Sequence, residues 1–289
     1  MDTASFLIQL LNGIQYGFLL FLVASGLTLI FGIMGIINLA HGTFYMLGAY
    51  LTYWAWGLTQ NFLIAISLAL PLMIILGLII ERLAISYLYK RDHLYQVLLT
   101  YGLILILNEG QKILWGTDFH SIPTPDRLSG GMPIGDVQIY PFYRLFVSCV
   151  CLFIATILYL LIKHTRLGMI IRATANNQEI TETIGINTRH VYTAVFSLGI
   201  GLAGFSGMIG APLSSIYPGM GDHILIISFV VVVIGGIGSI RGAFFGAMLI
   251  GITDTFGKVL APEISSMVIY MIMALVLVWR PNGIFGKAG

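Results

Sequence analysis

Charged residues are scarce in this chain. Only 9% of its 289 residues are charged, whereas 58% are hydrophobic. An average soluble domain carries about 25% charged residues, so a soluble fold of this length would have too little polar surface to cover its apolar side chains. The formal net charge of +2 gives no reason to expect a nucleic-acid partner.

The sequence also lacks the motifs of enzymes and metal sites. Its two cysteines, Cys149 and Cys151, lie in an apolar run, so we interpret them as packing residues without a disulfide framework. It contains no G-x-x-x-x-G-K-[ST] phosphate loop, H-E-x-x-H or G-x-S-x-G motif. Asp222 and Asp254 have no partner motif of the kind an intramembrane protease needs. We expect no catalytic site, no metal site and no cofactor on this chain, with any ATP bound by separate subunits.

Long apolar runs dominate what is present. A helix needs about 20 apolar residues to cross a bilayer, whereas barrel strands show alternating segments of about ten. The continuous runs therefore predict an all-α, polytopic integral membrane protein, with about eight or nine membrane segments in a single domain over 1–289. The runs cover 6–31, 43–56, 62–80, 94–115, 142–162, 191–211, 224–234, 243–255 and 265–279.

The basic residues predict the orientation of the chain. Cytoplasmic loops carry an excess of Lys and Arg. We therefore place the C-terminus and the polar stretch 164–190 in the cytoplasm, and the acidic segment 116–140, with Asp118, Asp126 and Asp136 against Arg127, outside. The basic residues behind this assignment are Arg82, Lys90, Arg91, Lys163, Arg166, Arg172, Arg189, Arg280 and Lys287.

Two glycine-rich segments interrupt the apolar sequence, at 32–42 and 235–242. Paired interruptions of this kind are typical of the broken helices that line a transporter's pathway. Glycines that only let helices approach closely are the alternative. The polar side chains of Asn38, His41 and Arg241 favour the pathway, because polar groups at membrane depth are usually functional. The predicted pathway residues are Asn38, His41, Gly42, Gly235, Gly236, Gly238 and Ser239.

His41 allows two interpretations. Its imidazole could titrate within a pathway, or it could donate a hydrogen bond to a helix carbonyl. Glu109 and Lys112 stand at helical spacing near the end of a run, and we expect an interfacial ion pair there rather than a gate.

The stretch 164–190 predicts a helix outside the membrane. Residues 173–184 contain no Pro or Gly, and Gly185 stands where a C-terminal cap belongs. Glu179 and Glu182 share a face of that helix. An ordinary solvated loop is the alternative.

Several segments together resemble one family. G-L-T-L-I-F-G-I-M-G-I-I-N-L-A-H-G-T-F-Y-M-L-G-A-Y (26–50), T-R-L-G-M-I-I-R-A (165–173), I-G-I-N-T-R-H-V (184–191), G-G-I-G-S-I-R-G-A-F-F-G-A (235–247) and R-P-N-G-I-F-G (280–286) are similar to the membrane permease subunits of branched-chain amino acid ABC importers. The resemblance implies a second permease subunit, two cytoplasmic ATPase subunits and an extracytoplasmic substrate-binding protein. It also implies the plasma (inner) membrane of a bacterium or archaeon.

The resemblance implies transport of branched-chain or other small neutral amino acids. Related permeases carry urea, short amides or aromatic carboxylates, which remain alternatives. A stand-alone channel or secondary transporter would need neither ATP nor the polar stretch. Many import permeases carry Glu-Ala-Ala, three residues and Gly in a helix that contacts the ATPase. Glu179 and Gly185 match this pattern, although Ile180 and Thr181 replace the alanines. The predicted ATPase-coupling residues are Arg172, Asn176, Glu179, Glu182 and Gly185.

Overall fold

The computed structural model describes residues 2–89, 91–134 and 138–286. Lys90, Asp136 and Lys287, which entered the charge argument, lie outside the described residues. Each apolar run lies in its own helix: α1 (Thr3–Met34), α2 (His41–Thr59), α3 (Phe62–Leu83), α4 (His93–Trp115), α5 (Phe142–His164), α8 (Thr188–Gly210), α9 (Met220–Gly235), α10 (Ile240–Leu260) and α11 (Ser265–Trp279).

Among the described residues, six helices are long and apolar enough to cross a membrane: α1, α3, α4, α5, α8 and α10. The helices α9 and α11 are shorter apolar helices. The prediction of an all-α polytopic membrane protein is therefore confirmed. Cys151 is buried and Cys149 is exposed on α5, and both are free thiols, so only Cys151 fills the packing role predicted for both.

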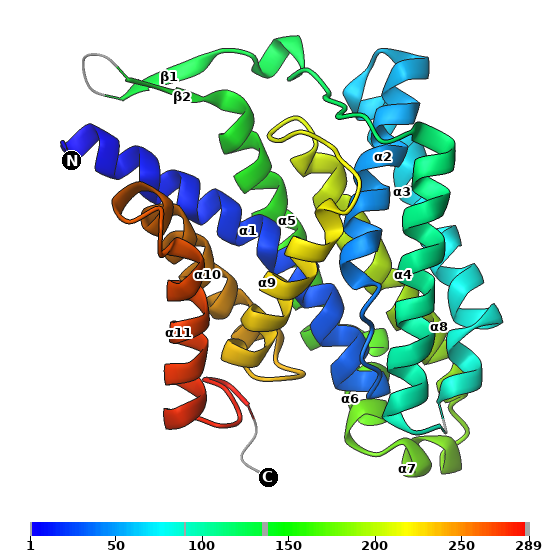
Figure 1. Ribbon diagram of the computed structural model, residues 1–289. Coiled ribbons are helices and arrows are strands. Elements are labelled where there is room, and N and C mark those ends of the chain that lie inside the picture. Colours follow the sequence, from blue (N-terminus) through cyan, green and yellow to red (C-terminus); the bar gives the residue numbers. More distant parts are fainter. Residues whose placement is uncertain (1, 90, 135–137, 287–289) are drawn as a thin grey trace.

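The two ends of the bundle differ in structure (Figure 1). One end carries the short helices α6 (Arg166–Asn176) and α7 (Gln178–Thr183), together with the 3-10 turn η1 (Ile85–Leu88). The other carries the N-terminal start of α1 and a hairpin of β1 (Gly131–Ile134) and β2 (Gln138–Pro141), in which Met132 pairs with Tyr140. The sequence did not predict this hairpin. The acidic segment, which includes the turn η2 (Asp126–Leu128), thus lies opposite α6 and α7.

The helices α1 and α8 form the centre of the bundle. In their most apolar 18-residue stretches 78% and 83% of residues are buried, against 17% for α4 and α5. Lipid tails are as apolar as leucine, so helices in a bilayer associate through close packing and hydrogen bonds. Both occur on α8, which packs against α1, α2 and α3. Ser206 of α8 donates a 3.0 Å hydrogen bond to the Leu19 carbonyl of α1.

Glycines set the closest of these crossings. An ideal Cβ added to Gly48 of α2 would lie 2.1 Å from the carbonyl oxygen of Gly204 on α8. One added to Gly207 would lie 1.9 Å from the Tyr45 carbonyl oxygen. Any side chain at these positions must therefore push the two backbones apart, because atoms in packed interiors have no free volume to move into.

We predict that Gly48→Leu destabilises the protein by about 3 kcal/mol or more, because overpacking here must displace backbone rather than a flexible side chain. Gly102→Leu on α4 is the matched control, since a Cβ there meets nothing within 4 Å. The control should stay within about 0.5 kcal/mol of the wild type. Thermal unfolding and monodispersity in detergent report the stability of both variants. Equal stability of the two would contradict the close contact between α2 and α8.

Candidate functional site

The first glycine-rich segment separates α1 from α2. Gly35 ends α1 in the left-handed region at φ 65°, and α2 begins at His41. Between them, the Asn38 side-chain oxygen accepts a 3.1 Å hydrogen bond from the backbone N–H of Ala40. A turn closed by an Asn side chain stabilises a non-helical backbone. The chain is therefore broken here, as the glycines predicted.

Two buried polar side chains lie at this break. Asn38 and His41 are both 0% exposed. His41 Nε2 is 3.0 Å from the Val23 carbonyl oxygen of α1, so this nitrogen carries the proton and donates. The Asn38 amide nitrogen and His41 Nδ1 have no hydrogen-bond partner in the described part of the chain. Buried polar atoms are rarely left unpaired, and such a donor and acceptor are suited to binding water or a polar solute.

The sequence allowed two interpretations of His41. The structure shows one of them, a hydrogen bond from the imidazole to a helix carbonyl. The unpartnered Nδ1 belongs to the same ring, so a pathway role stays a prediction. Gly42 has a packing role: an ideal Cβ there would lie 2.1 Å from the Gly221 carbonyl oxygen of α9. A bulky side chain at Gly42 would therefore disturb folding, so a loss of transport in such a variant would not identify a pathway residue.

The second glycine-rich segment turns the chain between α9 and α10. Gly236 and Gly238 adopt φ 97° and φ 79°, and the Ser239 hydroxyl caps α10 by accepting from the Gly242 N–H at 3.1 Å. Gly235 and Gly242 touch backbone to backbone, because an ideal Cβ on Gly242 would lie 1.9 Å from the Gly235 carbonyl oxygen. Both glycine segments therefore interrupt helices, and Gly235, like Gly42, also permits close packing.

The chain after α11 returns to cover the end of α9. The backbone N–H groups of Ile284 and Phe285 donate to the carbonyl oxygens of Ile234 and Gly235 at 2.8 and 3.0 Å. The last carbonyls of a helix have no partner within it, so this segment satisfies groups that lipid could not. The family-like segment 280–286 therefore caps the C-terminal end of α9.

A cavity of about 850 Å³ opens at this second break. It brings two predicted coupling residues, Arg172 and Asn176, next to two predicted pathway residues, Gly238 and Ser239. Asn38, His41 and Gly42 do not line it. The lining consists of Phe31, Gly32, Arg172, Ala175, Asn176, Val233, Ile237, Gly238, Ser239, Leu277, Pro281, Asn282, Phe285 and Gly286.

The polar stretch forms two helices rather than one. The prediction of a continuous helix over 173–184 is wrong, because Asn177 leaves helical geometry at φ −157° and ψ 107°. Its side chain accepts from the Ile180 N–H at 3.0 Å and so starts α7 anew. Gly185 does follow the helix at φ 87°, and its N–H donates to the Glu182 carbonyl at 2.9 Å. The Ile186 N–H donates to the Thr181 carbonyl at 3.3 Å, which completes a Schellman motif.

The two glutamates of α7 differ in their contacts. Glu179 is exposed. Glu182 accepts hydrogen bonds from the Gln178 amide at 2.9 Å and from the Thr188 hydroxyl at 2.5 Å. Thr188 is the first residue of α8, so Glu182 fixes α7 to the central helix of the bundle.

Four exposed apolar side chains lie on α6, on α7 and at the C-cap of α7. They were not predicted from the sequence, although Ile180 and Ile184 stand four residues apart within a polar stretch and so indicate one apolar helix face. We call the following set the α6–α7 surface: Leu167 (63% exposed), Met169 (58%), Ile180 (61%) and Ile184 (67%).

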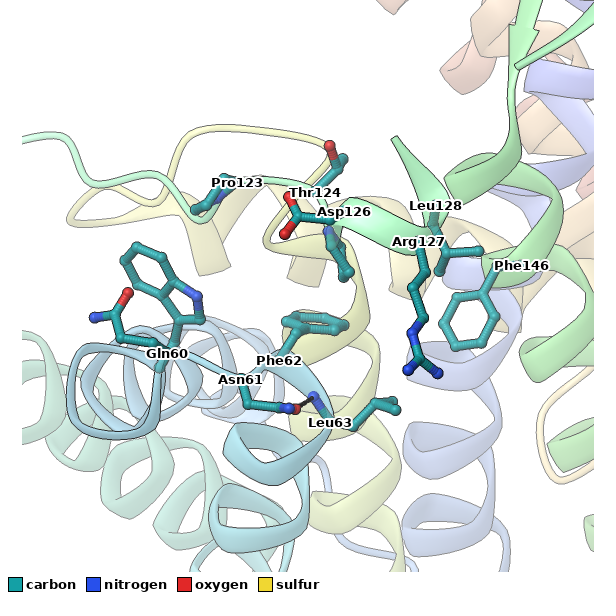
Figure 2. A pocket seen from close by; sticks show the side chains of 12 residues that line it. Gln60, Asn61, Phe62, Leu63, Pro123, Thr124, Asp126, Arg127, Leu128 and Phe146 are labelled. Carbon is teal, nitrogen blue, oxygen red and sulfur yellow. Dashed lines mark hydrogen bonds between the residues drawn. The ribbon is translucent and has the colours of Figure 1, made fainter. Parts of the chain in front are cut away.

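A pocket of about 700 Å³ lies at the opposite end of the bundle (Figure 2). The ends of α2 and α3 line it, together with the loop 123–128 and Phe146 of α5. Figure 2 shows the Arg127 side chain extending between Leu63 and Phe146. The acidic segment thus forms a structured, partly apolar surface there.

Comparison with known protein sequences identifies the family of this chain. The sequence model of the family described as "Branched-chain amino acid transport system / permease component" matches residues 9–277. The permease protein BraD of Pseudomonas aeruginosa, named for high-affinity branched-chain amino acid transport, is 30% identical over 98% of this chain and 96% of its own length. No solved structure is a significant match.

Two permease proteins of one organism also match. LivH of Escherichia coli is 28% identical over 98% of this chain and 96% of its own length. LivM of the same bacterium is 24% identical over 91% of this chain and 67% of its own length. The chain therefore belongs to the permease components of branched-chain amino acid transport systems, the membrane subunits of ABC importers.

Proposed function

We propose that this chain pairs with a second permease subunit and imports branched-chain or other small neutral amino acids. Two separate ATPase subunits bind and hydrolyse the ATP, and an extracytoplasmic binding protein delivers the substrate. The names of BraD, LivH and LivM support the substrate class. The match to both LivH and LivM supports a pair of related permeases.

The α6–α7 surface carries the proposal that ATPases dock on this chain. It lies at one end of the bundle, on helices too short and too polar to span a bilayer. Exposed apolar area costs free energy in water, about 25 cal/mol for each Å², and a protein partner removes that cost. Glu182 and its contacts with Gln178 and Thr188 would pass a push on α7 directly to α8.

The same assignment orients the protein. With α6 and α7 in the cytoplasm of a bacterium or archaeon, the described basic residues Arg82, Arg172 and Arg280 belong to that side of the inner membrane. The acidic segment and the pocket of Figure 2 then face outward, where the binding protein arrives.

Substrate would pass between the two glycine breaks. The unpaired polar atoms of Asn38 and His41 offer transient hydrogen bonds, and the cavity beside Gly238 and Ser239 offers an exit toward the coupling helices. Such a route has few fixed charges. It suits a permease that releases its substrate readily and leaves recognition to the binding protein.

Replacing Ile180 and Ile184 with serine should weaken ATPase association at least tenfold, roughly 1.4 kcal/mol, because apolar anchors are lost from the contact. Leu260→Ser is the control, since that leucine is 69% exposed at the end of α10. Co-purification of the ATPases with tagged permease measures the effect. Undiminished association of the double variant would refute docking on this surface.

Single cysteines in a cysteine-free background test the orientation. Ser121→Cys, in the acidic segment, should react with an impermeant maleimide added to intact cells. Thr183→Cys, on α7, should react only after the membrane is permeabilised. Both native residues are exposed in the isolated chain. The permease is expressed without its ATPases, so that no partner covers α7 during labelling. The reverse pattern would place α6 and α7 outside and remove the docking proposal.

Asn38→Ser separates the structural from the transport role of Asn38. A serine hydroxyl can still accept from the Ala40 N–H and close the turn, but the unpaired amide nitrogen is gone. We expect normal assembly and thermal stability with uptake reduced about tenfold, the effect of losing roughly 1.4 kcal/mol. Uptake equal to the wild type would show that this nitrogen does not serve transport.

A further inference from the structure

A buried carboxylate lies near the end of the bundle that carries α6 and α7. Glu81, in the last turn of α3, is 0% exposed. Among the residues that the structure describes, no Lys or Arg forms an ion pair with it. Two hydroxyl groups occupy its oxygens: Tyr89 donates to Oε1, and Thr193 of α8 donates to Oε2 at 2.7 Å.

These two hydrogen bonds stabilise the buried side chain of Glu81. A carboxylate inside a membrane bundle costs several kcal/mol unless its oxygens are hydrogen-bonded. Burial raises the pKa of the Tyr89 hydroxyl, and its bond to Glu81 raises it further, so Tyr89 remains a donor. The carboxylate therefore ties α3, the link after η1 and the start of α8 together at one point.

Further contacts continue from this point to the α6–α7 surface. The rings of Tyr89 and Tyr192 meet edge to face at 4.9 Å. The Tyr192 hydroxyl donates to the Gln178 side-chain oxygen of α7 at 2.9 Å. An unbroken series of contacts thus joins α7 to Glu81.

The helix α8 also reaches the first glycine break. Gly199 of α8 packs against Gly26 of α1, where an ideal Cβ on Gly26 would lie 2.5 Å from the Gly199 carbonyl oxygen. The same Cβ would lie 3.1 Å from the His41 ring. Movement of α8 along its axis would therefore displace Gly26 of α1 and the adjacent His41 ring, because no free volume separates these groups.

We propose that Glu81 is a positioning residue for transport, which locks the cytoplasmic ends of α3 and α8 together through Tyr89 and Thr193. A displacement of α7 by the ATPases then moves α3 and α8 as one body toward the first glycine break. Without the lock, α7 and the start of α8 move locally and ATP is hydrolysed without import. The inference depends on the proposed function, because it needs ATPases that act on α7.

The complete transporter in proteoliposomes tests the proposal, with leucine molecules imported per ATP hydrolysed as the measured quantity. Glu81→Ala should lower this ratio about tenfold, a size typical of coupling between sites. Glu81→Gln should restore it, because both hydroxyls can accept as well as donate. Glu109→Ala is the control, since Glu109 is an exposed carboxylate paired with Lys112 at 2.6 Å on α4.

A wild-type ratio in Glu81→Ala would overturn the proposal, and so would an equal loss in Glu81→Gln. If Glu81→Ala does not fold, the isosteric variant Thr193→Val decides, because it removes the link from Glu81 to α8 while the Tyr89 hydroxyl still donates to the carboxylate. A lowered ratio supports the lock, and an unchanged ratio overturns it. Failure of the wild-type complex to import leucine, or to retain its ATPases, would instead count against the proposed function.

Discussion

Close backbone contact between helices is the constraint on which the structure depends. In lipid the hydrophobic effect does not draw helices together, so association needs van der Waals contact and hydrogen bonds. The helix α8 meets α1 and α2 backbone to backbone, so that a Cβ on Gly26, Gly48 or Gly207 would overlap a carbonyl oxygen of the facing helix. These contacts hold α8 from Gly199 onward. We therefore propose that α8 carries movement from its start beside α7 to the centre of the bundle.

The lipid environment also limits where a helix can be broken. A break in lipid leaves backbone groups unpaired, so it is tolerated only where other protein groups satisfy them. Asn38 closes the first break, and the returning segment at Ile284 and Phe285 covers the second. Each break therefore has a supporting structure. The second lies beside the cavity that Arg172 and Asn176 also line, so the proposed substrate route and the proposed coupling helices are neighbours in space.

The features that lipid imposes could be predicted from the sequence. Apolar runs became helices, and the glycine segments became breaks, because few other conformations are stable in a bilayer. The interruption of the predicted coupling helix at Asn177 could not be predicted, because it depends on a local side-chain hydrogen bond that competes with the helix. Glu81 was not predicted as a functional residue, because its role depends on a hydrogen bond from Thr193, which is 112 residues away in the sequence. A glutamate that closes an apolar run is otherwise typical of a helix boundary.

Binding of the ATPases at α7 is the step on which the proposed transfer of movement to α8 depends. Site-specific photo-crosslinking in the assembled transporter tests it most directly, with a benzophenone amino acid at Ile184 and, for comparison, at Phe119 near the opposite end, both exposed side chains. We predict that the probe at Ile184 crosslinks to an ATPase subunit and that the probe at Phe119 does not. Crosslinks from Ile184 only to lipid or to the second permease, with the complex intact, would contradict the claim.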